Sequence, residues 1–329
     1  MFQKCYTKFS WVSIMSKRKK LIILISLICC MVIAVGVVCL IVLHTVNSKA
    51  LYGIEDTLPD GKGRNAKVVI LAGQSNAAGC SLNEYLRNNV SDEKYSEYTN
   101  GYDNVYINYY STGYNVSNKF VKVVIGQGDT VNYFGPEVGL AEKLHQLYPD
   151  ELFFIIKFAC SGSSLYSNWL SPSSDGETGV YYPSFVKFVQ RSMNYLNYKG
   201  YNAKIEAMCW MQGESDSFFV ETATNYQTNL NNFIADIRSD LSSYAAGDGI
   251  GFVDAYIADN PMYWVYCDLV NQSKQAVADM SDLNVVIDTI TKGLDCSQEP
   301  EDTPDMAHYD SLSEIKLGHL FAEHVVGFF

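Results

Sequence analysis

The chain has 329 residues and a formal net charge of −12, from 36 acidic residues against 24 lysines and arginines. All the acidic residues but only 18 of the basic ones follow residue 43, so this larger part carries about −18. Nucleic acids and anionic membrane surfaces are bound by basic protein faces, so the charge excludes both as ligands of this part. The charge places no restriction on a neutral sugar.

The first element is a basic segment followed by an apolar one. Residues 1–20 carry six lysines and arginines, and residues 21–43, "LIILISLICCMVIAVGVVCLIVL", carry no charge. A helix of this length spans the roughly 30 Å hydrocarbon layer of a membrane. Because basic flanks stay cytoplasmic, the sequence predicts a cytoplasmic segment 1–20, a single-pass transmembrane signal anchor at 21–43 and an extracytoplasmic remainder.

Two alternatives concern this N-terminal region. A cleaved secretory signal would release the remainder, and "SKA" at residues 48–50 loosely fits a cleavage site. An apolar core of this length exceeds that of ordinary signal peptides and favours the anchor. Met15, just before the basic cluster, is an alternative start of the chain.

The remainder divides into a short polar linker, residues 44–64, and one domain, residues 65–329. Almost continuously apolar runs predict strands at 67–72, 152–159, 205–211, 251–256 and 285–288. Segments of helical period predict helices at 136–147, 184–198, 222–244, 263–280 and 311–326. Apolar strands that alternate with helices are typical of a parallel sheet covered on both faces, so we expect a three-layer α/β/α domain. Active sites of such domains lie at the carboxyl ends of the strands.

Residues 80–134 do not fit this alternation, because they are polar and rich in tyrosine and asparagine. We expect loops and a hairpin there. Together with residues 165–183 they are expected to determine specificity, although neither stretch indicates which sugar is bound. Five of the nine cysteines follow the apolar segment, and their spacing is not that of metal ligands. They are therefore interpreted as small buried hydrophobic residues, with a single disulfide between two of them as the alternative.

The first candidate for chemistry is Ser75, in "VVILAGQSNAAG" at residues 68–79. It follows a predicted strand and is expected at the carboxyl edge of the sheet. Serine is also common in glycine-containing turns, so this stretch alone leaves a structural role open. Gln74 and Asn76, on either side, are expected to support the turn.

A serine nucleophile needs a base, and His308 is the histidine that lies in a loop beside a carboxylate, in "TPDMAHYD". Asp305 precedes it by three residues, so the carboxylate is placed to bind one imidazole nitrogen while the other accepts the serine proton. A capping aspartate and a surface histidine are the alternative for this pair taken alone.

Two further stretches follow predicted strands and are expected at the same carboxyl edge of the sheet as Ser75. "MCWMQGESDS" delivers Gln212, whose amide could donate to an oxyanion, and "FACSGSSLYSNWL" delivers Gly162, whose backbone N–H could do the same. Glu214 and Asp216 resemble an acid pair or metal ligands. With no nearby histidine or third acid, hydrogen bonding to loops is the favoured interpretation.

These four blocks, in this order, resemble the SGNH hydrolases, and most of all the sialate O-acetylesterase-like branch that includes carbohydrate esterase family 6. The resemblance covers about residues 66–326. It implies a flavodoxin-like sheet, no metal, no cofactor and a carbohydrate O-acetylesterase activity through an acetyl-enzyme. The block "CSGSSL" departs from the usual double glycine, and Met306–Ala307 replace the pair that often precedes the histidine.

Carried over by position, the resemblance implies that Ser75 is the nucleophile, His308 the general base and Asp305 its orienting carboxylate. The Ser75 backbone N–H, Gly162 and Gln212 fall where the family forms its oxyanion hole. The implied substrate is an O-acetylated glycan of unspecified sugar, and nothing indicates the oligomeric state.

Two other classes of protein remain as alternatives. A carbohydrate-binding or adhesion module without turnover is suggested by the 24 tyrosines, many within residues 96–114. A lipase or peptidase of the α/β-hydrolase type is disfavoured, because "GQSNA" lacks the second glycine of the G-x-S-x-G elbow.

Overall fold

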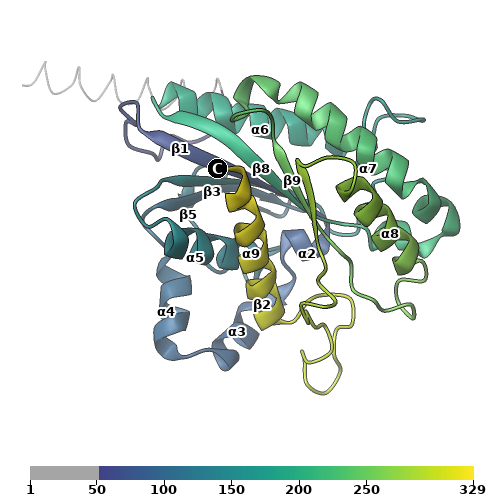
Figure 1. Ribbon diagram of the computed structural model, residues 1–329. Coiled ribbons are helices and arrows are strands. Elements are labelled where there is room, and N and C mark those ends of the chain that lie inside the picture. The colour runs from purple at the N-terminus through teal and green to yellow at the C-terminus, as the bar shows by residue number, and fades with distance from the viewer. Residues whose placement is uncertain (1–51) are drawn as a thin grey trace, which may run out of the picture. The chain divides into compact units, whose positions relative to one another are not determined.

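Six parallel strands form the centre of the structure, a computed structural model that describes residues 52–329 (Figure 1). In spatial order they are β10 (Asn284–Ile287), β9 (Gly251–Ala255), β8 (Asn202–Met211), β1 (Asn65–Gly73), β7 (Phe153–Ala159) and β3 (Val105–Ser111). Among them β1, β7, β8 and β9 are almost completely buried, which explains why their sequences are nearly continuous apolar runs.

The five strands predicted from the sequence are β1, β7, β8, β9 and β10. Counted in chain order, they lie side by side as 2-1-3-4-5, the order of flavodoxin-like sheets. β3 extends this sheet beside β7, and the short strands β4 (Asn115–Val116) and β5 (Val121–Lys122) pair with it antiparallel. A separate pair, β2 (Ser81–Leu82) and β6 (Tyr133–Phe134), lies outside the large sheet.

Helices cover both faces of the sheet, which confirms the expected layers (Figure 1). α5 (Glu137–Leu147) and α9 (Ser311–Val325) pack together on one face. α6 (Tyr181–Tyr198), α7 (Val220–Asp240) and α8 (Cys267–Ala278) cover the other. Three short helices, α2 (Ser75–Ala78), α3 (Asn83–Asn89) and α4 (Asp92–Asn100), lie before β3 in the chain.

The expectation for residues 80–134 was incomplete, because this stretch contains α3, α4 and the sixth parallel strand. β3 has the sequence "VYINYYS", with Asn108 fully buried in it. The Asn108 amide donates to Ser192 Oγ (3.0 Å) and accepts from Ser117 Oγ (2.9 Å). A polar residue whose hydrogen bonds are satisfied can occupy a buried strand, but it removes the apolar run that predicts one.

The N-terminal part of the described chain also differs from the expected linker. Ile54 and Leu58 are buried against the core, and Asp56 Oδ1 accepts a hydrogen bond from Tyr195 on α6 (2.8 Å). Residues 54–58 therefore belong to the folded unit. No helix within residues 52–329 is both long and apolar enough to cross a membrane, and the predicted span 21–43 lies outside the described residues. The five cysteines of the described part are all free thiols.

Lys157, in the middle of β7, is fully buried. Its ammonium donates to Glu137 Oε2 (2.7 Å), to the carbonyl of Ala78 (2.8 Å) and to the carbonyl of Gln127 (2.9 Å). Glu137 is also fully buried, and its Oε1 accepts from the Gly135 N–H (2.9 Å). One ammonium thus joins the end of α2, a loop and the start of α5 to the sheet.

We expect Lys157→Met to lower the free energy of unfolding by about 3–5 kcal/mol, because Glu137 would remain as a buried charge without its partner. Denaturant unfolding of the purified protein measures this change. The double variant Lys157→Met/Glu137→Leu should recover much of the loss. The matched control Lys143→Met, which breaks the partly exposed pair with Glu323 (3.1 Å), should change stability by less than about 1 kcal/mol. Equal stability of the single and double variants would contradict the explanation by an unpaired charge.

Candidate active site

The turn that carries Ser75 lies where the carboxyl ends of β1 and β8 meet. Gly73 has φ of +143°, and a Cβ there would stand 1.9 Å from the carbonyl oxygen of Met211. The next residue, Gln74, donates its backbone N–H to that same carbonyl (2.9 Å). Only glycine permits this approach, and Ser75 therefore begins α2 directly against the end of β8.

The Gln74 side chain fastens this turn to the loop after β8. Its Oε1 accepts from Gln212 Nε2 (3.1 Å), from the Ser215 N–H (3.2 Å) and from the Gly213 N–H (3.4 Å). Gln74 is buried, so these bonds are shielded from water. The supporting role expected for Gln74 is confirmed.

The Asn76 side chain reaches in the opposite direction, to the C-terminal loop. Its Oδ1 accepts from the Tyr309 N–H (3.1 Å), and its Nδ2 lies 3.4 Å from the carbonyl oxygen of Ala307. Nδ2 also donates to Glu214 Oε1 (2.7 Å). Ala307 and Tyr309 are the two neighbours of His308, so the residue next to Ser75 holds the backbone on both sides of this histidine.

Asp305 and His308 form the predicted pair. His308 Nδ1 lies 2.6 Å from Asp305 Oδ2, and Asp305 Oδ1 accepts from the Ala307 N–H (3.1 Å). Since Nδ1 faces the carboxylate, Nε2 is the nitrogen left for proton transfer. The sequence separation of three residues predicted this contact correctly.

The pKa values of the pair shift in opposite directions. Burial lowers the pKa of His308, but the hydrogen bond with Asp305 and the proximity of Cys80 outweigh burial and raise it well above its ordinary value. The hydrogen bond with His308 lowers the pKa of Asp305, against a smaller opposing effect of burial. The pair is therefore an imidazole held beside an ionised carboxylate.

Ser75 Oγ makes no hydrogen bond to another residue of the described chain, although the residue is only 7% exposed. Within residues 52–329, the backbone N–H groups of Ser75 and Gly162 also lack hydrogen-bond partners. Gly162 follows β7, whose end is tied to β1 by a bond from the Cys160 N–H to the carbonyl of Gly73 (3.0 Å). Space in front of Gly162 is open, because a Cβ there would meet nothing within 4 Å.

Gln212 does not offer the free donor that the sequence suggested. It is fully buried, and its Nε2 donates to Asp216 Oδ2 (2.6 Å) and to the carbonyl of Ser163 (3.0 Å), besides Gln74. Two amide protons already face three acceptors, so none is left for a substrate oxyanion. The structure contradicts the expectation that this amide is an available oxyanion donor, and Gln212 instead holds neighbouring loops.

Glu214 and Asp216 act through hydrogen bonds, as the favoured interpretation expected. Asp216 accepts from Ser164 Oγ (2.8 Å), the Leu165 N–H (2.8 Å) and the Tyr166 N–H (2.9 Å), in addition to Gln212. Burial raises the pKa of Asp216, and these donors oppose the rise. The carboxylate thereby fixes the loop that follows Gly162.

Cys80 is a neighbour of His308 that the sequence did not reveal. With Asp305 and His308 it lines a cavity of about 130 Å³, whose wall also contains Tyr85 and Tyr133. Cys80 and His308 lie far apart in the chain, and no spacing pattern connects them. The candidate base therefore forms part of the wall of this cavity, whereas Ser75 does not line it.

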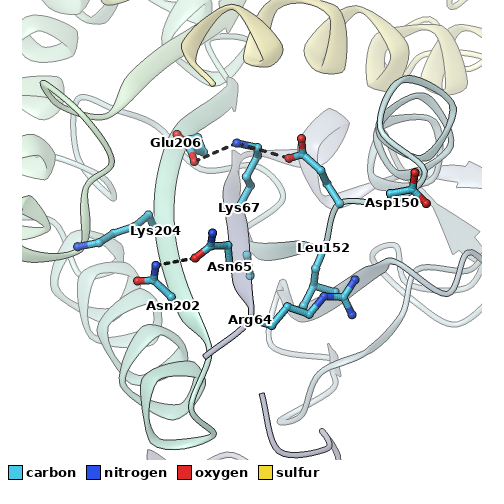
Figure 2. A pocket seen from close by; sticks show the side chains of 10 residues that line it. Arg64, Asn65, Lys67, Asp150, Leu152, Asn202, Lys204 and Glu206 are labelled. Atoms are coloured by element: carbon cyan, nitrogen blue, oxygen red, sulfur yellow. Dashed lines mark hydrogen bonds and ion pairs between the residues drawn. The ribbon is translucent and has the colours of Figure 1, made fainter. Parts of the chain in front are cut away.

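Another cavity lies at the opposite edge of the sheet and is not the candidate site. It measures about 530 Å³ and is formed at the amino ends of β1, β7 and β8 (Figure 2). Lys67 is bound there between Glu151 (3.5 Å) and Glu206 (3.8 Å). Because its central charge is already paired and Ser75 is at the other end of β1, this cavity has no part in chemistry at Ser75.

Solved structures support the fold. The chain is similar to a protein from Arabidopsis thaliana at 19% identity and a TM-score of 0.58, covering 83% of this chain and 100% of that one. It is similar to NanS at 15% identity and a TM-score of 0.60, covering 83% and 99%. A carbohydrate acetylesterase from Xanthomonas citri matches at 12% identity and a TM-score of 0.51, covering 80% and 56%. No curated protein matches the chain in sequence.

Residues 65–327 match the family described as carbohydrate esterase, sialic acid-specific acetylesterase. This match spans most of the chain, and the protein belongs to that family. The resemblance drawn from the four sequence blocks is confirmed.

We expect Asp305→Asn to lower the pKa of His308, because burial persists while the interaction that opposes it is removed. NMR titration of the imidazole measures the shift. In the parent, the stability from this raised pKa is fully present below about pH 6.5 and is lost as pH rises through the folded-state value. Since the folded-state pKa is raised to about 11, the unfolding free energy of the parent should fall between about pH 6.5 and about pH 11 more steeply than that of Asp305→Asn.

Asp302→Asn is the matched control for this variant, since it removes an exposed carboxylate from the same loop. It should leave the His308 titration unchanged. An unaltered titration in Asp305→Asn would show that the 2.6 Å contact does not control the imidazole.

Proposed function

We propose that this carbohydrate esterase removes O-acetyl groups from a glycan by serine catalysis, with Ser75 as nucleophile, His308 as general base and Asp305 as the orienting carboxylate. The observation that carries the proposal is the Asn76 side chain, which binds the N–H of Tyr309 and the carbonyl of Ala307. It makes the position of His308 depend on the residue that follows Ser75. Two segments from opposite ends of the domain are thereby bonded to each other, which supports their assignment to one catalytic site.

The first half of the proposed reaction transfers the acetyl group to the enzyme. Ser75 Oγ attacks the acetyl carbonyl carbon while its proton passes to His308 Nε2. The resulting tetrahedral intermediate collapses, the bond from carbon to the sugar oxygen breaks, and His308 returns the proton to that oxygen. The deacetylated sugar leaves, and an acetyl ester of Ser75 remains.

The second half restores the serine. His308 Nε2 accepts a proton from water, and the water oxygen attacks the acetyl carbon. Collapse of this second intermediate breaks the bond to Ser75 Oγ, which regains its proton from His308, and acetate leaves. Asp305 keeps the imidazole in one orientation and stabilises its protonated form in both halves.

The negative oxygen of each intermediate requires hydrogen-bond donors. The backbone N–H groups of Ser75 and Gly162 are the donors that we assign, since neither has a partner within residues 52–329 and the space in front of Gly162 is open. Gln212 contributes indirectly, because its amide bonds to Asp216 and Ser163 hold the loop that contains Gly162.

Ser75→Ala tests the nucleophile. We expect acetate release from a chromogenic acetate ester to fall by about 10³-fold or more, because no other group at this turn supplies the attacking oxygen. The unfolding free energy should change little. Ser273→Ala is the matched control, since Ser273 is nearly as buried but lies on α8 with its hydroxyl bound to the carbonyl of Leu269 (2.8 Å). Equal rates for Ser75→Ala and the parent would reject the proposed role.

We further propose that residues 21–43 anchor the protein in the membrane, with the esterase domain on the extracytoplasmic side. The support is the 23-residue uncharged stretch and the basic residues before it. Full-length protein should remain in the membrane pellet after alkaline extraction and keep its original N-terminus. A soluble product that begins near residue 50 would instead indicate cleavage.

A further inference from the structure

We propose that the loop between β7 and α6 forms a binding subsite for neutral sugar units next to the acetylated one, so that the substrate is a neutral oligosaccharide or polysaccharide. The inference rests on the proposed esterase function and narrows its substrate class.

The subsite is a cavity of about 440 Å³ formed by residues 166–168, 170 and 175–180. Its volume falls within the roughly 300–1,000 Å³ of small-ligand sites. It belongs to the stretch 165–183 that the sequence singled out as a specificity loop without revealing its ligand.

The cavity is linked to the candidate active site by direct bonds. Asp216 binds the N–H groups of Leu165 and Tyr166 (2.8 and 2.9 Å), and the same carboxylate binds Gln212, which contacts Gln74. Tyr166 lies only four residues after Gly162, whose N–H we assign to the oxyanion. A ligand in this cavity would therefore be bound by the same loop that carries the Gly162 N–H.

The loop holds its shape without a ligand. Trp169 is fully buried and its indole N–H donates to Ser163 Oγ (2.7 Å). The Gly179 N–H donates to the carbonyl of Leu170 (2.8 Å), and the Tyr181 N–H donates to that of Asn168 (2.9 Å). A cavity that is already formed binds its ligand at a low cost in conformational entropy.

Tyr166 supplies the stacking surface of the subsite. Its phenol donates to Glu221 Oε1 (2.9 Å), and its N–H is held by Asp216, so both ends of the residue are fixed. The ring is partly exposed at the cavity. A fixed aromatic face is suited to the apolar C–H face of a sugar ring.

The charges around the cavity determine which sugars fit. Asp175 and Glu177 line it with exposed carboxylates that can accept hydrogen bonds from sugar hydroxyls. No lysine or arginine is among the described residues that line it. An anionic sugar would be repelled, whereas a neutral one would not.

The test compares three acetyl esters with the full-length protein: O-acetylated cellotetraose, O-acetylated methyl glucoside and para-nitrophenyl acetate. Tyr166→Ala should lower kcat/KM for the tetrasaccharide about tenfold, the loss expected for one aromatic contact. The rates on the two small esters should stay within about twofold, which also shows that the variant is folded. Tyr166→Phe, which keeps the ring, should retain most of the activity on the tetrasaccharide.

Tyr244→Ala is the matched control, because this tyrosine is also partly exposed and donates one hydrogen bond, to Asn194 Oδ1 (2.9 Å). It should leave all three rates unchanged. An equal loss on all three esters in Tyr166→Ala, or no loss on the tetrasaccharide, would overturn the subsite.

Calorimetric titration with unacetylated cellotetraose separates this inference from the esterase proposal. Binding by the parent that weakens about tenfold in Tyr166→Ala supports the subsite even if no ester is cleaved, in which case only the esterase function is rejected. Equal affinity of the parent and Tyr166→Ala, or no binding by either, rejects the subsite and leaves the esterase function standing.

Discussion

The buried Lys157 ammonium is the contact on which the arrangement of the site depends. It satisfies its three protons with Glu137, Ala78 and Gln127, and so fixes the end of the short helix that begins at Ser75. A second buried lysine, Lys274, lies beneath the loop after β8 and donates to Asp254 (2.6 Å). Burial raises the pKa of Asp254 to about 6, against the opposing effect of Lys274. A buried lysine thus lies against each of the two turns that meet at the site, the turn of Ser75 and the loop after β8. Because neither ammonium is in contact with water, its electrostatic contacts are strong.

Two amide side chains, those of Gln74 and Asn76, hold the turn that contains Ser75. Gln74 connects its turn to the loop after β8, and Asn76 connects it to the segment around His308. An amide suits both positions because it donates and accepts hydrogen bonds without a charge of its own. The serine hydroxyl is left without a protein partner in the described chain, whereas the residues on either side of it are fully engaged.

The sequence predicted the features that depend on local periodicity and short spacing. The five apolar strands, the five long helices and the contact of Asp305 with His308 all follow from patterns within a few residues. The sequence did not predict features that depend on hydrogen bonds between residues far apart in the chain. β3 was missed because Asn108 is satisfied by Ser192, and the free donor expected at Gln212 is absent because Asp216 and Gln74 occupy its amide. Such competition is a property of the assembled structure and leaves no trace in spacing.

The attachment of Asn76 to both neighbours of His308 also separates two parts of the C-terminal loop. Residues 289–304, which lead into it, are bonded to the segment around His308, because the Asp305 N–H donates to the carbonyl of Glu299 (2.9 Å) and the Glu299 N–H donates to Asp310 Oδ1 (2.9 Å). The position of the imidazole is set on the far side of that segment, by bonds to Asn76 and by Asp305. Related chains can therefore lengthen or shorten the exposed tip at residues 301–303, which the bond from Asp305 to Glu299 closes off, whereas the spacing from Asp305 to Tyr309 is fixed. Length changes among relatives should therefore be concentrated in this tip and absent from residues 305–309.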